Sequence, residues 1–359
     1  MTRHQTIRMQ KEDVKEHKIE KCDRIARPAR RLLASGASRL TAHVSRLNEE
    51  GIALIMVLWI LVMLTIVALN YLGSSRANSA GTRNLKEETQ SYYMALSGYH
   101  EALQYLMSDK DPGFDFFDTD GNFRVDRDTP PVTGTRNVGD GEVNIRITDE
   151  DSKININYVQ PERLKSLLEY AGIPEEAIPE LMDSIEDWKD PSSKETHRLL
   201  GAGDDYYESL SAPYTAKHGP FDVPEELLLV KGMKPEYLYG SKDIKPLLPL
   251  VTTFGRGGMN INTVSQDVMT MLGLDNFEIE AVMKQRTAEA GGFTFVPEQF
   301  ARLGFGATSS GVLRIEVTAR AHSKGPASKV VAIINRQPAG GTYKIQTLYW
   351  RESAENIRG

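Results

Sequence analysis

The N-terminal third of the chain contains a long apolar run. Residues 52–69 read IALIMVLWILVMLTIVAL and include one polar side chain, Thr65. A helix of roughly 20 residues crosses a hydrocarbon core of about 30 Å, so this run is long enough to span a membrane. A core helix of a soluble protein would carry polar residues along one side. The pattern therefore favours a transmembrane helix, and its predicted lipid-facing residues include Ile52, Leu54, Met56, Trp59 and Leu69.

Helical spacing continues beyond the apolar run. An apolar stripe recurs at intervals of three, four or seven residues and consists of Leu85, Tyr92, Leu96, Tyr99, Leu103 and Leu106. This spacing predicts that the helix continues to Met107 and packs on a small sheet. Residues 111–141 are rich in turn signals and predict a loop. Alternating apolar and polar residues predict four antiparallel strands, at 142–148, 312–321, 329–334 and 343–350.

Between the first and second of these strands the pattern is largely helical, and it contains an internal repeat. The segments 155–157 and 260–262 both read Asn-Ile-Asn, and the residues that follow them align at an offset of 105. Each segment precedes an amphipathic helix, a glycine turn at Gly172 or Gly273, and a second helix. The pattern predicts two helix-hairpin-helix-like units.

Together these elements predict the fold class and the domain organisation. The fold is expected to be α+β, with a long N-terminal helix packed on a small antiparallel sheet and a large helical domain inserted into it. The expected parts are a leader (1–51), the transmembrane part of the helix (52–75), the helix continuation with loop and first strand (76–150), the inserted helical domain (151–308) and the C-terminal strands (309–359).

Charge and cysteine content indicate the membrane orientation and exclude some classes of binding site. The formal net charge is −6, yet residues 1–51 carry an excess of Lys and Arg while the rest of the chain is acidic. The positive-inside rule then places the N-terminus in the cytoplasm and the body outside the membrane. An acidic body argues against binding of a phosphate backbone as the main function. The single cysteine, Cys22, excludes a disulfide framework and a cysteine metal site in the body.

Catalytic and nucleic-acid motifs are weak. The histidines of the body are scattered, and no glycine-rich loop leads into Lys-Ser or Lys-Thr, so no enzyme is expected. The helical hairpins leave one alternative open, a membrane-anchored helix-hairpin-helix module that binds DNA outside the inner membrane. The second hairpin turn, however, places Asp275 where a phosphate would lie, so nucleic acid is not an expected partner.

The start of the apolar run carries a family resemblance. A basic leader followed by Gly51 directly before an uncharged run resembles a type IV prepilin cleavage site, although the Glu usual five residues later is Met56 here. The lack of this Glu resembles the K minor pseudopilins of type II secretion systems. The segments 186–190 (EDWKD), 201–207 (GAGDDYY) and 260–263 (NINT) resemble the same family. The resemblance extends from residue 51 to about residue 335.

The resemblance implies a pilin-like architecture with SAM-like helical repeats, and a processing step. A prepilin peptidase would cut after Gly51 and methylate the amine of Ile52, so the apolar helix would remain as an anchor in the bacterial inner membrane. The body would lie in the periplasm at the tip of the pseudopilus. Its partners would be other minor pseudopilins and inner-membrane secretion components, and its role would be to assist protein export across the outer membrane.

The resemblance also implies a calcium site in the helical domain. The family's calcium-associated acids match Asp187, Asp190, Asp204 and Asp205. Calcium prefers such hard oxygen ligands. Two positions depart from the family pattern, because Ser192 and Gly203 stand where acids are usual. The alternative is a solvated acidic loop held by Asx turns.

Overall fold

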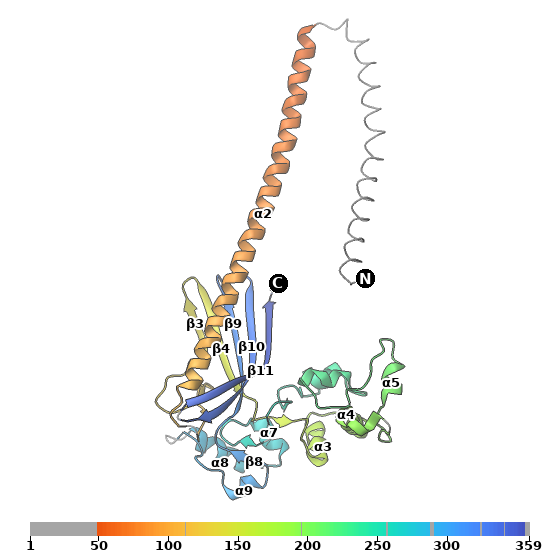
Figure 1. Ribbon diagram of the computed structural model, residues 1–359, viewed down its shortest axis with the longest axis vertical. Helices are drawn as coiled ribbons and strands as arrows, with labels where there is room; N and C mark the ends of the chain where they lie inside the picture. Colours follow the sequence, from red (N-terminus) through yellow and green to blue (C-terminus); the bar gives the residue numbers. More distant parts are fainter. Residues whose placement is uncertain are drawn as a thin grey trace, which may run out of the picture. The chain divides into compact units, whose positions relative to one another are not determined.

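The computed structural model describes residues 49–111, 113–194, 196–255, 258–287, 291–323, 325–340 and 342–355. Residues 1–48 of the predicted leader lie outside these ranges. The chain divides into two compact units, Met1–Gly81 and Thr82–Gly359, and each is described by itself. The mixed helix-and-sheet class with an apolar N-terminal helix is confirmed (Figure 1), whereas the finer boundaries between the expected parts stay predictions.

Helix α2 (Glu49–Met107) contains the apolar run. Its segment Leu54–Leu72 has a mean hydropathy of 2.5 and no buried side chain. The side chains of Leu54, Met56, Trp59 and Leu69 are exposed by 74%, 59%, 65% and 63%. An uncovered apolar surface of this length requires lipid or other protein around it. The segment is therefore a candidate membrane span, as the sequence predicts.

The second unit contains a five-stranded antiparallel sheet with the order β11-β10-β9-β4-β3. Its strands are β3 (Gly134–Val138), β4 (Gly141–Asp149), β9 (Val312–Arg320), β10 (Ala327–Ala339) and β11 (Thr342–Glu355). The four expected strands are present. The expectation of a loop over 111–141 is wrong at β3, which pairs with β4 through a two-residue turn at Gly139-Asp140. Most of β3 is exposed, so its sequence lacks the alternation that reveals a strand.

The end of α2 packs on this sheet with most of the expected stripe, since Tyr99 and Leu106 are buried there and Leu96 and Leu103 pack against the same core. The fully buried residues of α2 include Ala95, Ala102 and Leu106, which pack against β4, β9 and β10. Leu85 of the predicted stripe is instead 64% exposed, while Leu96 and Leu103 are half-buried. Small residues bring the helix close to the sheet, and a pattern built on large apolar residues overlooks them.

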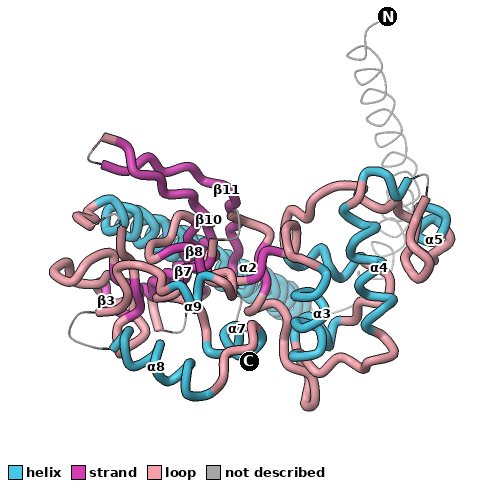
Figure 2. Tube along the Cα trace, turned by 90° about the horizontal axis from the view of Figure 1, so that it is seen from below, coloured by secondary structure: helices cyan, strands magenta, loops and turns pink. Residues whose placement is uncertain are grey.

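The shorter elements lie in the loop after α2 and between β4 and β9. Their bounds are β1 (Phe116–Phe117), β2 (Phe123–Arg124), β5 (Ile154–Asn155), α3 (Pro161–Tyr170), α4 (Ile178–Lys189), η1 (Pro191–Lys194), α5 (Asp204–Glu208), η2 (Pro224–Leu229), α6 (Pro235–Tyr239), β6 (Val251–Thr252), β7 (Met259–Asn260), α7 (Gln266–Met271), α8 (Asn276–Thr287), α9 (Glu298–Ala301) and β8 (Phe305–Ala307). The tube in Figure 2 shows that α3, α4 and α5 gather on one side of this region, while α8 and α9 lie on the other.

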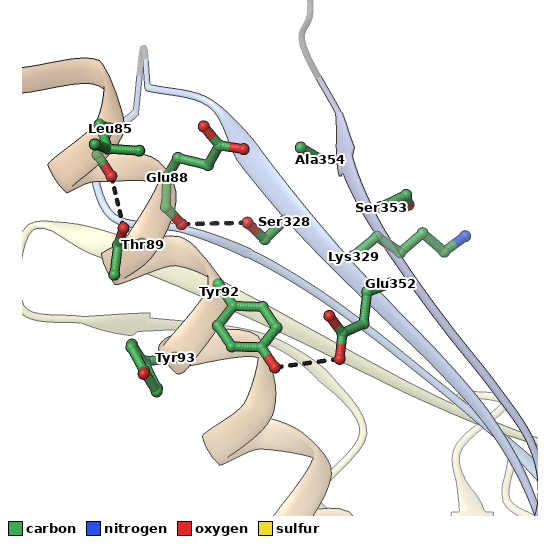
Figure 3. Close-up of a pocket in the computed structure, with 10 residues that line it drawn as sticks. All are labelled: Leu85, Glu88, Thr89, Tyr92, Tyr93, Ser328, Lys329, Glu352, Ser353 and Ala354. Atoms are coloured by element: carbon green, nitrogen blue, oxygen red, sulfur yellow. Dashed lines mark hydrogen bonds between the residues drawn. The ribbon is translucent and has the colours of Figure 1, made fainter. Parts of the chain in front are cut away.

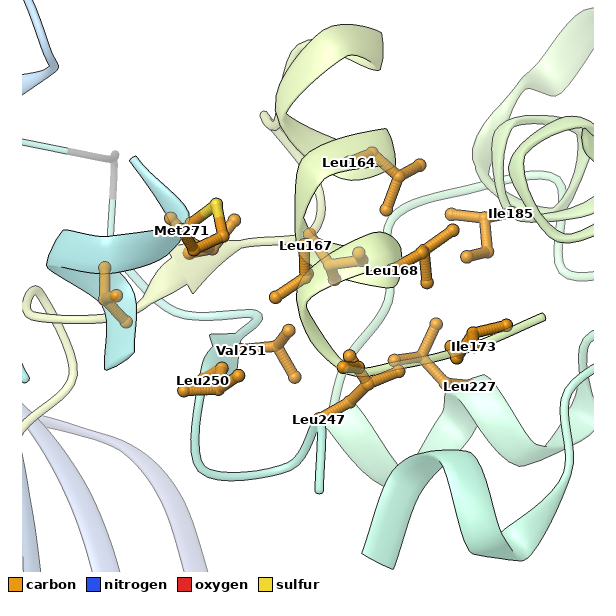
Figure 4. Close-up of a cluster of buried hydrophobic side chains, with 14 of the residues drawn as sticks. Leu164, Leu167, Leu168, Ile173, Ile185, Leu227, Leu247, Leu250, Val251 and Met271 are labelled. Atoms are coloured by element: carbon orange, nitrogen blue, oxygen red, sulfur yellow. The ribbon is translucent and has the colours of Figure 1, made fainter. Parts of the chain in front are cut away.

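A continuous apolar core holds this helical region together. Figure 4 shows leucine side chains of α3 pointing towards residues of α4, η2 and the segment that leads into β6. Leu164, Leu167 and Leu168 are at most 1% exposed, and the same cluster extends to Val268 and Val282 of the second half. Burial of these side chains stabilises the region by about 1.5–3 kcal/mol each.

The two halves share their backbone pattern. β5 pairs with β6 and β7 with β8, both in parallel, and each half has a helix that ends at a glycine with positive φ, Gly172 or Gly273. The expected offset of 105 holds at the helix starts, Pro161 and Gln266. The turn glycines that the sequence names, Gly172 and Gly273, are 101 residues apart, so the second helix is the shorter one. Helix α7 has six residues and α3 has ten, about one turn more.

Candidate functional site

Asp187, which the sequence predicts as a calcium ligand, lies near the end of α4. Its carboxylate forms an ion pair with the side chain of Arg198. Its carboxylate is fully buried, and Arg198 Nη1 lies 2.7 Å from its Oδ1. The backbone N–H of Arg198 also donates to both carboxylate oxygens, at 3.0 and 3.2 Å. A buried carboxylate needs such a partner. Burial opposes the charge of Arg198, yet Asp187 raises the pKa of this guanidinium overall.

Asp190 faces the same guanidinium from the end of α4. Its Oδ1 accepts hydrogen bonds from the backbone N–H and the hydroxyl of Ser192, at 2.9 and 2.7 Å. Its Oδ2 lies 3.7 Å from Arg198 Nη1. The Ser192 hydrogen bonds and Arg198 hold the pKa of Asp190 below its usual value. Ser192 therefore acts as a double donor to Asp190.

Asp204, at the start of α5, has a different partner. Its Oδ1 lies 2.9 Å from His218 Nε2 and accepts a hydrogen bond from the Ala216 N–H at 2.9 Å. The other ring nitrogen of His218 lies 2.9 Å from Ser193 Oγ. These contacts outweigh burial and lower the pKa of Asp204. The fourth predicted ligand, Asp205, is exposed next to it.

Aromatic packing fixes the backbone of these loops. The Trp188 ring meets Tyr207 edge-on at 5.3 Å and stacks with Phe221 at 6.3 Å. Its Nε1–H donates to Glu226 Oε1 at 2.9 Å. Such aromatic contacts each contribute about 0.5–1.5 kcal/mol beyond area burial. The Trp motif therefore orders the segment that carries Asp187 and Asp190.

The donor set fits a calcium ion poorly. Calcium takes six to eight oxygen ligands at 2.3–2.6 Å, and the described part of the chain has no group of three or more His, Cys, Asp or Glu residues placed to hold a metal. Asp187 and Asp190 share Arg198, while Asp204 pairs with His218. Sequence reasoning missed both partners, although each is a basic residue within an acid-rich stretch.

A second polar cluster, also missed from the sequence, lies where β4 ends and the helical region begins. Asp149 Oδ2 accepts hydrogen bonds from the hydroxyls of Thr263 and Ser310, and its Oδ1 accepts one from the Asp151 N–H. Burial, and then the charge of Asp151, raise the pKa of Asp149 to about 7. The adjacent Glu150 pairs with Arg314 and Lys153. This cluster ties the sheet to the inserted helices.

In the second hairpin turn, which was considered as a DNA-binding element, the backbone N–H groups of Asp275 and Glu278 already have hydrogen-bond acceptors within the chain. The turn after Gly273 leads into α8, where the Asp275 carboxylate accepts from the Glu278 N–H at 2.8 Å and the Glu278 carboxylate accepts from the Asp275 N–H at 3.0 Å. This reciprocal capping occupies backbone donors that would otherwise face a phosphate. It also adds two negative charges at the turn.

The flank of the sheet offers an open groove beside α2. Figure 3 shows Tyr92 reaching across to Glu352, and Ser328 pointing towards the α2 backbone. The Tyr92 hydroxyl donates to Glu352 Oε1 at 3.1 Å. The cavity measures about 380 Å³ and is bordered by the exposed side chains of Leu85 and Tyr93. It provides mixed polar and apolar surface along the part of α2 that precedes its contact with the sheet core.

Comparison with known proteins shows which proteins the chain resembles. The family model of type II secretion system protein K matches residues 142–253. The type II secretion system protein K of Pseudomonas aeruginosa is 26% identical over 257 residues, which cover 69% of this chain and 74% of the relative. The protein of the same name from Aeromonas hydrophila is 26% identical over 247 residues, covering 63% and 70%.

A solved structure has a similar fold. A chain in the crystal structure of the GspK-GspI-GspJ complex of the enterotoxigenic Escherichia coli type 2 secretion system matches with a TM-score of 0.58 at 17% identity, over 76% of this chain and 99% of that chain. The matched family domain contains the Trp motif and the loops around Arg198. Residues 142–253 of the chain therefore match the type II secretion system protein K domain, the chain is similar to proteins of that name over about two thirds of its length, and these similarities support a minor pseudopilin role.

Proposed function

We propose that the protein caps the tip of a pseudopilus, where it assembles with other minor pseudopilins and assists protein export across the outer membrane. The observation that carries this proposal is the large helical region between β4 and β9. It lies at the end of the sheet where α2 finishes (Figure 1). A further subunit that stacked on this end would meet closely packed helices instead of an open sheet.

The exposed apolar segment of α2 supports membrane anchoring and contact with neighbouring subunits. Leu54–Leu72 has no polar stripe that would mark one buried face, and both lipid and other apolar helices can cover such a surface. The basic excess before it favours a cytoplasmic N-terminus and a periplasmic body. The groove beside Tyr92 and Glu352 adds a second surface for a partner on the folded unit.

The tip position can be tested by labelling. A gold-labelled antibody against a tag at the C-terminus should mark only the ends of overproduced pseudopili. The same tag on the major pseudopilin should mark the whole length and serves as the control. Label from this protein along the shaft would contradict the proposal.

Processing by a prepilin peptidase after Gly51, with methylation of Ile52, belongs to the same proposal. Intact mass of the membrane-extracted protein should correspond to a chain that begins at Ile52 and carries one added methyl group. A Gly51→Asp variant should keep its leader. The matched control Gly81→Asp should be cleaved normally, because nothing lies within 4 Å of a β-carbon added at Gly81. A native chain that keeps residues 1–51 would overturn this part.

We further propose that the two helix-hairpin-helix-like units are SAM-like packing modules. The reciprocal capping by Asp275 and Glu278 supports this reading over DNA binding. The detergent-solubilised chain should leave the mobility of duplex DNA unchanged even at low salt, where phosphate contacts are strongest. A salt-dependent shift would instead favour the alternative of a membrane-anchored DNA-binding module.

A further inference from the structure

The loop between α4 and α5 corresponds to a calcium loop in the resembled family, and it is contacted by two protein cations, Arg198 within the loop and Lys231 just after η2. We propose that Arg198 and Lys231 act as built-in cations that take the place of a calcium ion, so that this loop folds without bound metal. The inference concerns the folding of the loop and does not depend on the tip position.

The carboxylates are satisfied by Arg198. Its guanidinium lies 2.7 Å from Asp187 Oδ1 and 3.7 Å from Asp190 Oδ2, so one cation serves two acids. The Arg198 backbone N–H closes the remaining side of the Asp187 carboxylate. Both oxygens of the buried acid therefore have a donor from within the chain.

The loop carbonyls are satisfied by Lys231. Backbone carbonyls are common calcium ligands. Here Lys231 Nζ donates to the carbonyls of Leu200 and Gly201, at 3.1 and 3.2 Å. The same ammonium pairs with Glu180 at 3.2 Å and lies 5.3 Å from the centre of the Tyr206 ring. The lysine is thus held on several sides and occupies both of these carbonyl oxygens.

Little room is left for an ion at Asp187. A β-carbon added at Gly201 would lie 1.7 Å from Asp187 Oδ2, because the carboxylate is pressed against the loop backbone. The two departures from the family pattern agree with this arrangement. Ser192 donates to Asp190, and Gly203 adds no carboxylate to the neighbouring Asp204 and Asp205. Fewer acids leave less negative charge for a metal ion to balance, and Arg198 balances the charge of Asp187 and Asp190.

The first test uses the native full-length chain in detergent. Its thermal unfolding midpoint should be the same in excess EGTA and in millimolar calcium. Isothermal titration with calcium chloride should show no saturable binding in the millimolar range, where extracellular modules bind calcium. A midpoint that falls by several degrees in EGTA, or saturable calcium binding, would overturn the proposal.

The second test changes the charge of Arg198. Arg198→Met keeps most of the side-chain volume but leaves Asp187 buried without its cation, so the midpoint should fall by roughly 5 °C or more. Arg198→Lys should lose less because it retains the charge. The control is Arg302→Met, which breaks an exposed ion pair with Glu298 and should change the midpoint by about 1 °C or less.

The role of charge can be separated from a loss of packing. The double variant Asp187→Asn with Arg198→Met removes both charges and should recover most of the loss, since no uncompensated carboxylate remains. A double variant as unstable as Arg198→Met would mean that only packing matters, and it would contradict the cation role. Arg198→Met as stable as the native chain would contradict it as well.

Discussion

Gly98 of α2 and Val317 of β9 lie so close that a β-carbon on residue 98 would come within 2.8 Å of Val317 Cγ1. The same β-carbon would lie 3.0 Å from Val143 Cγ1 of β4. Ala95 and Ala102, about one turn away on either side, are fully buried. The distance between helix and sheet is therefore set by a stripe of small residues.

This contact predicts opposite effects for two glycine substitutions in one helix. Gly98→Ala should destabilise the folded unit, because overpacking costs about 1–3 kcal/mol and outweighs the roughly 0.5–1 kcal/mol gained in helix propensity. Gly81→Ala should be neutral or stabilising, since nothing lies within 4 Å of its added β-carbon. Urea unfolding followed by circular dichroism measures both, and equal effects would show that the helix is not tightly seated on the sheet.

The same stripe explains what the sequence could and could not predict. The existence of α2 followed from its long apolar and helical pattern, because that signal is local. Its buried face followed only in part: Tyr99 and Leu106 of the predicted stripe are buried, but the pattern included the exposed Leu85 and missed Gly98 and Ala102, which carry almost no apolar signal. Which face meets the sheet depends on how close the two can approach, and this is a property of the tertiary structure.

At the candidate site, too, some residues could be predicted from the sequence and others could not. The acids Asp187 and Asp204 could be named from a motif, because their neighbours in sequence carry the resemblance. Their partners Arg198 and His218 are 11 and 14 residues further along the chain, and only loop folding brings each pair together. The cluster around Asp149 was missed for the same reason, since Thr263 and Ser310 are distant in sequence.

Asn157 and Asn262 make equivalent hydrogen bonds in the two helical halves, so we expect substitution of either one to destabilise the fold. The Asn262 amide donates to the carbonyls of Phe293 and Thr308 and accepts from the Phe293 N–H. Asn157 makes the same three contacts with Phe221 and Thr253. An Asn→Asp change at either position replaces the donor with a carboxylate that faces two carbonyls. Unsatisfied buried polar groups cost about 1–3 kcal/mol each, so Asn262→Asp, at a fully buried position, should cost about 2–4 kcal/mol, and Asn157→Asp, at a half-buried position, should cost about 1–3 kcal/mol.

The matched control for these variants is Asn137→Asp, on the exposed part of β3. It makes the same chemical change and should alter the unfolding free energy by less than about 0.5 kcal/mol. Chemical denaturation of all three variants provides the comparison. If only one of the two asparagines proved sensitive, the two halves would share geometry but not energetics.

Arg336 forms a buried ion-pair network near the end of α2, and we expect its removal to destabilise the fold. Its guanidinium pairs with Asp109 at 2.9 Å and Asp115 at 2.6 Å, and all three side chains are at most 2% exposed. Arg336→Met leaves two buried carboxylates without their cation and should cost about 3–5 kcal/mol. Arg83→Met breaks only the 3.7 Å pair of a largely exposed arginine with Glu87 and should cost under about 1 kcal/mol. Similar losses in a denaturant titration would contradict the assignment of Arg336 as the buried partner.

Asp149 predicts a pH dependence of stability. Its folded-state pKa of about 7 lies above the ordinary aspartate value of about 3.9. Between these values the folded chain binds more protons than the unfolded chain, so its unfolding free energy should fall as pH rises from about 4 to 7. One fully linked proton gives a slope of about 1.4 kcal/mol per pH unit. Asp115, whose pKa burial raises to about 6 despite Arg336, adds to the slope in the same direction.

Asp149→Asn should therefore flatten the profile, because the amide does not titrate while the hydroxyls of Thr263 and Ser310 can rotate to accept from it. The variant should match the native chain near pH 4–5 and exceed it in stability above pH 7, where the native carboxylate is charged. The control Asp120→Asn, in an exposed turn, should leave the profile unchanged. Thermal midpoints of the three proteins from pH 4 to pH 8 provide the measurement. Parallel profiles for the native chain and Asp149→Asn would mean that Asp149 is already ionised at low pH and that its hydroxyl partners stabilise the charge.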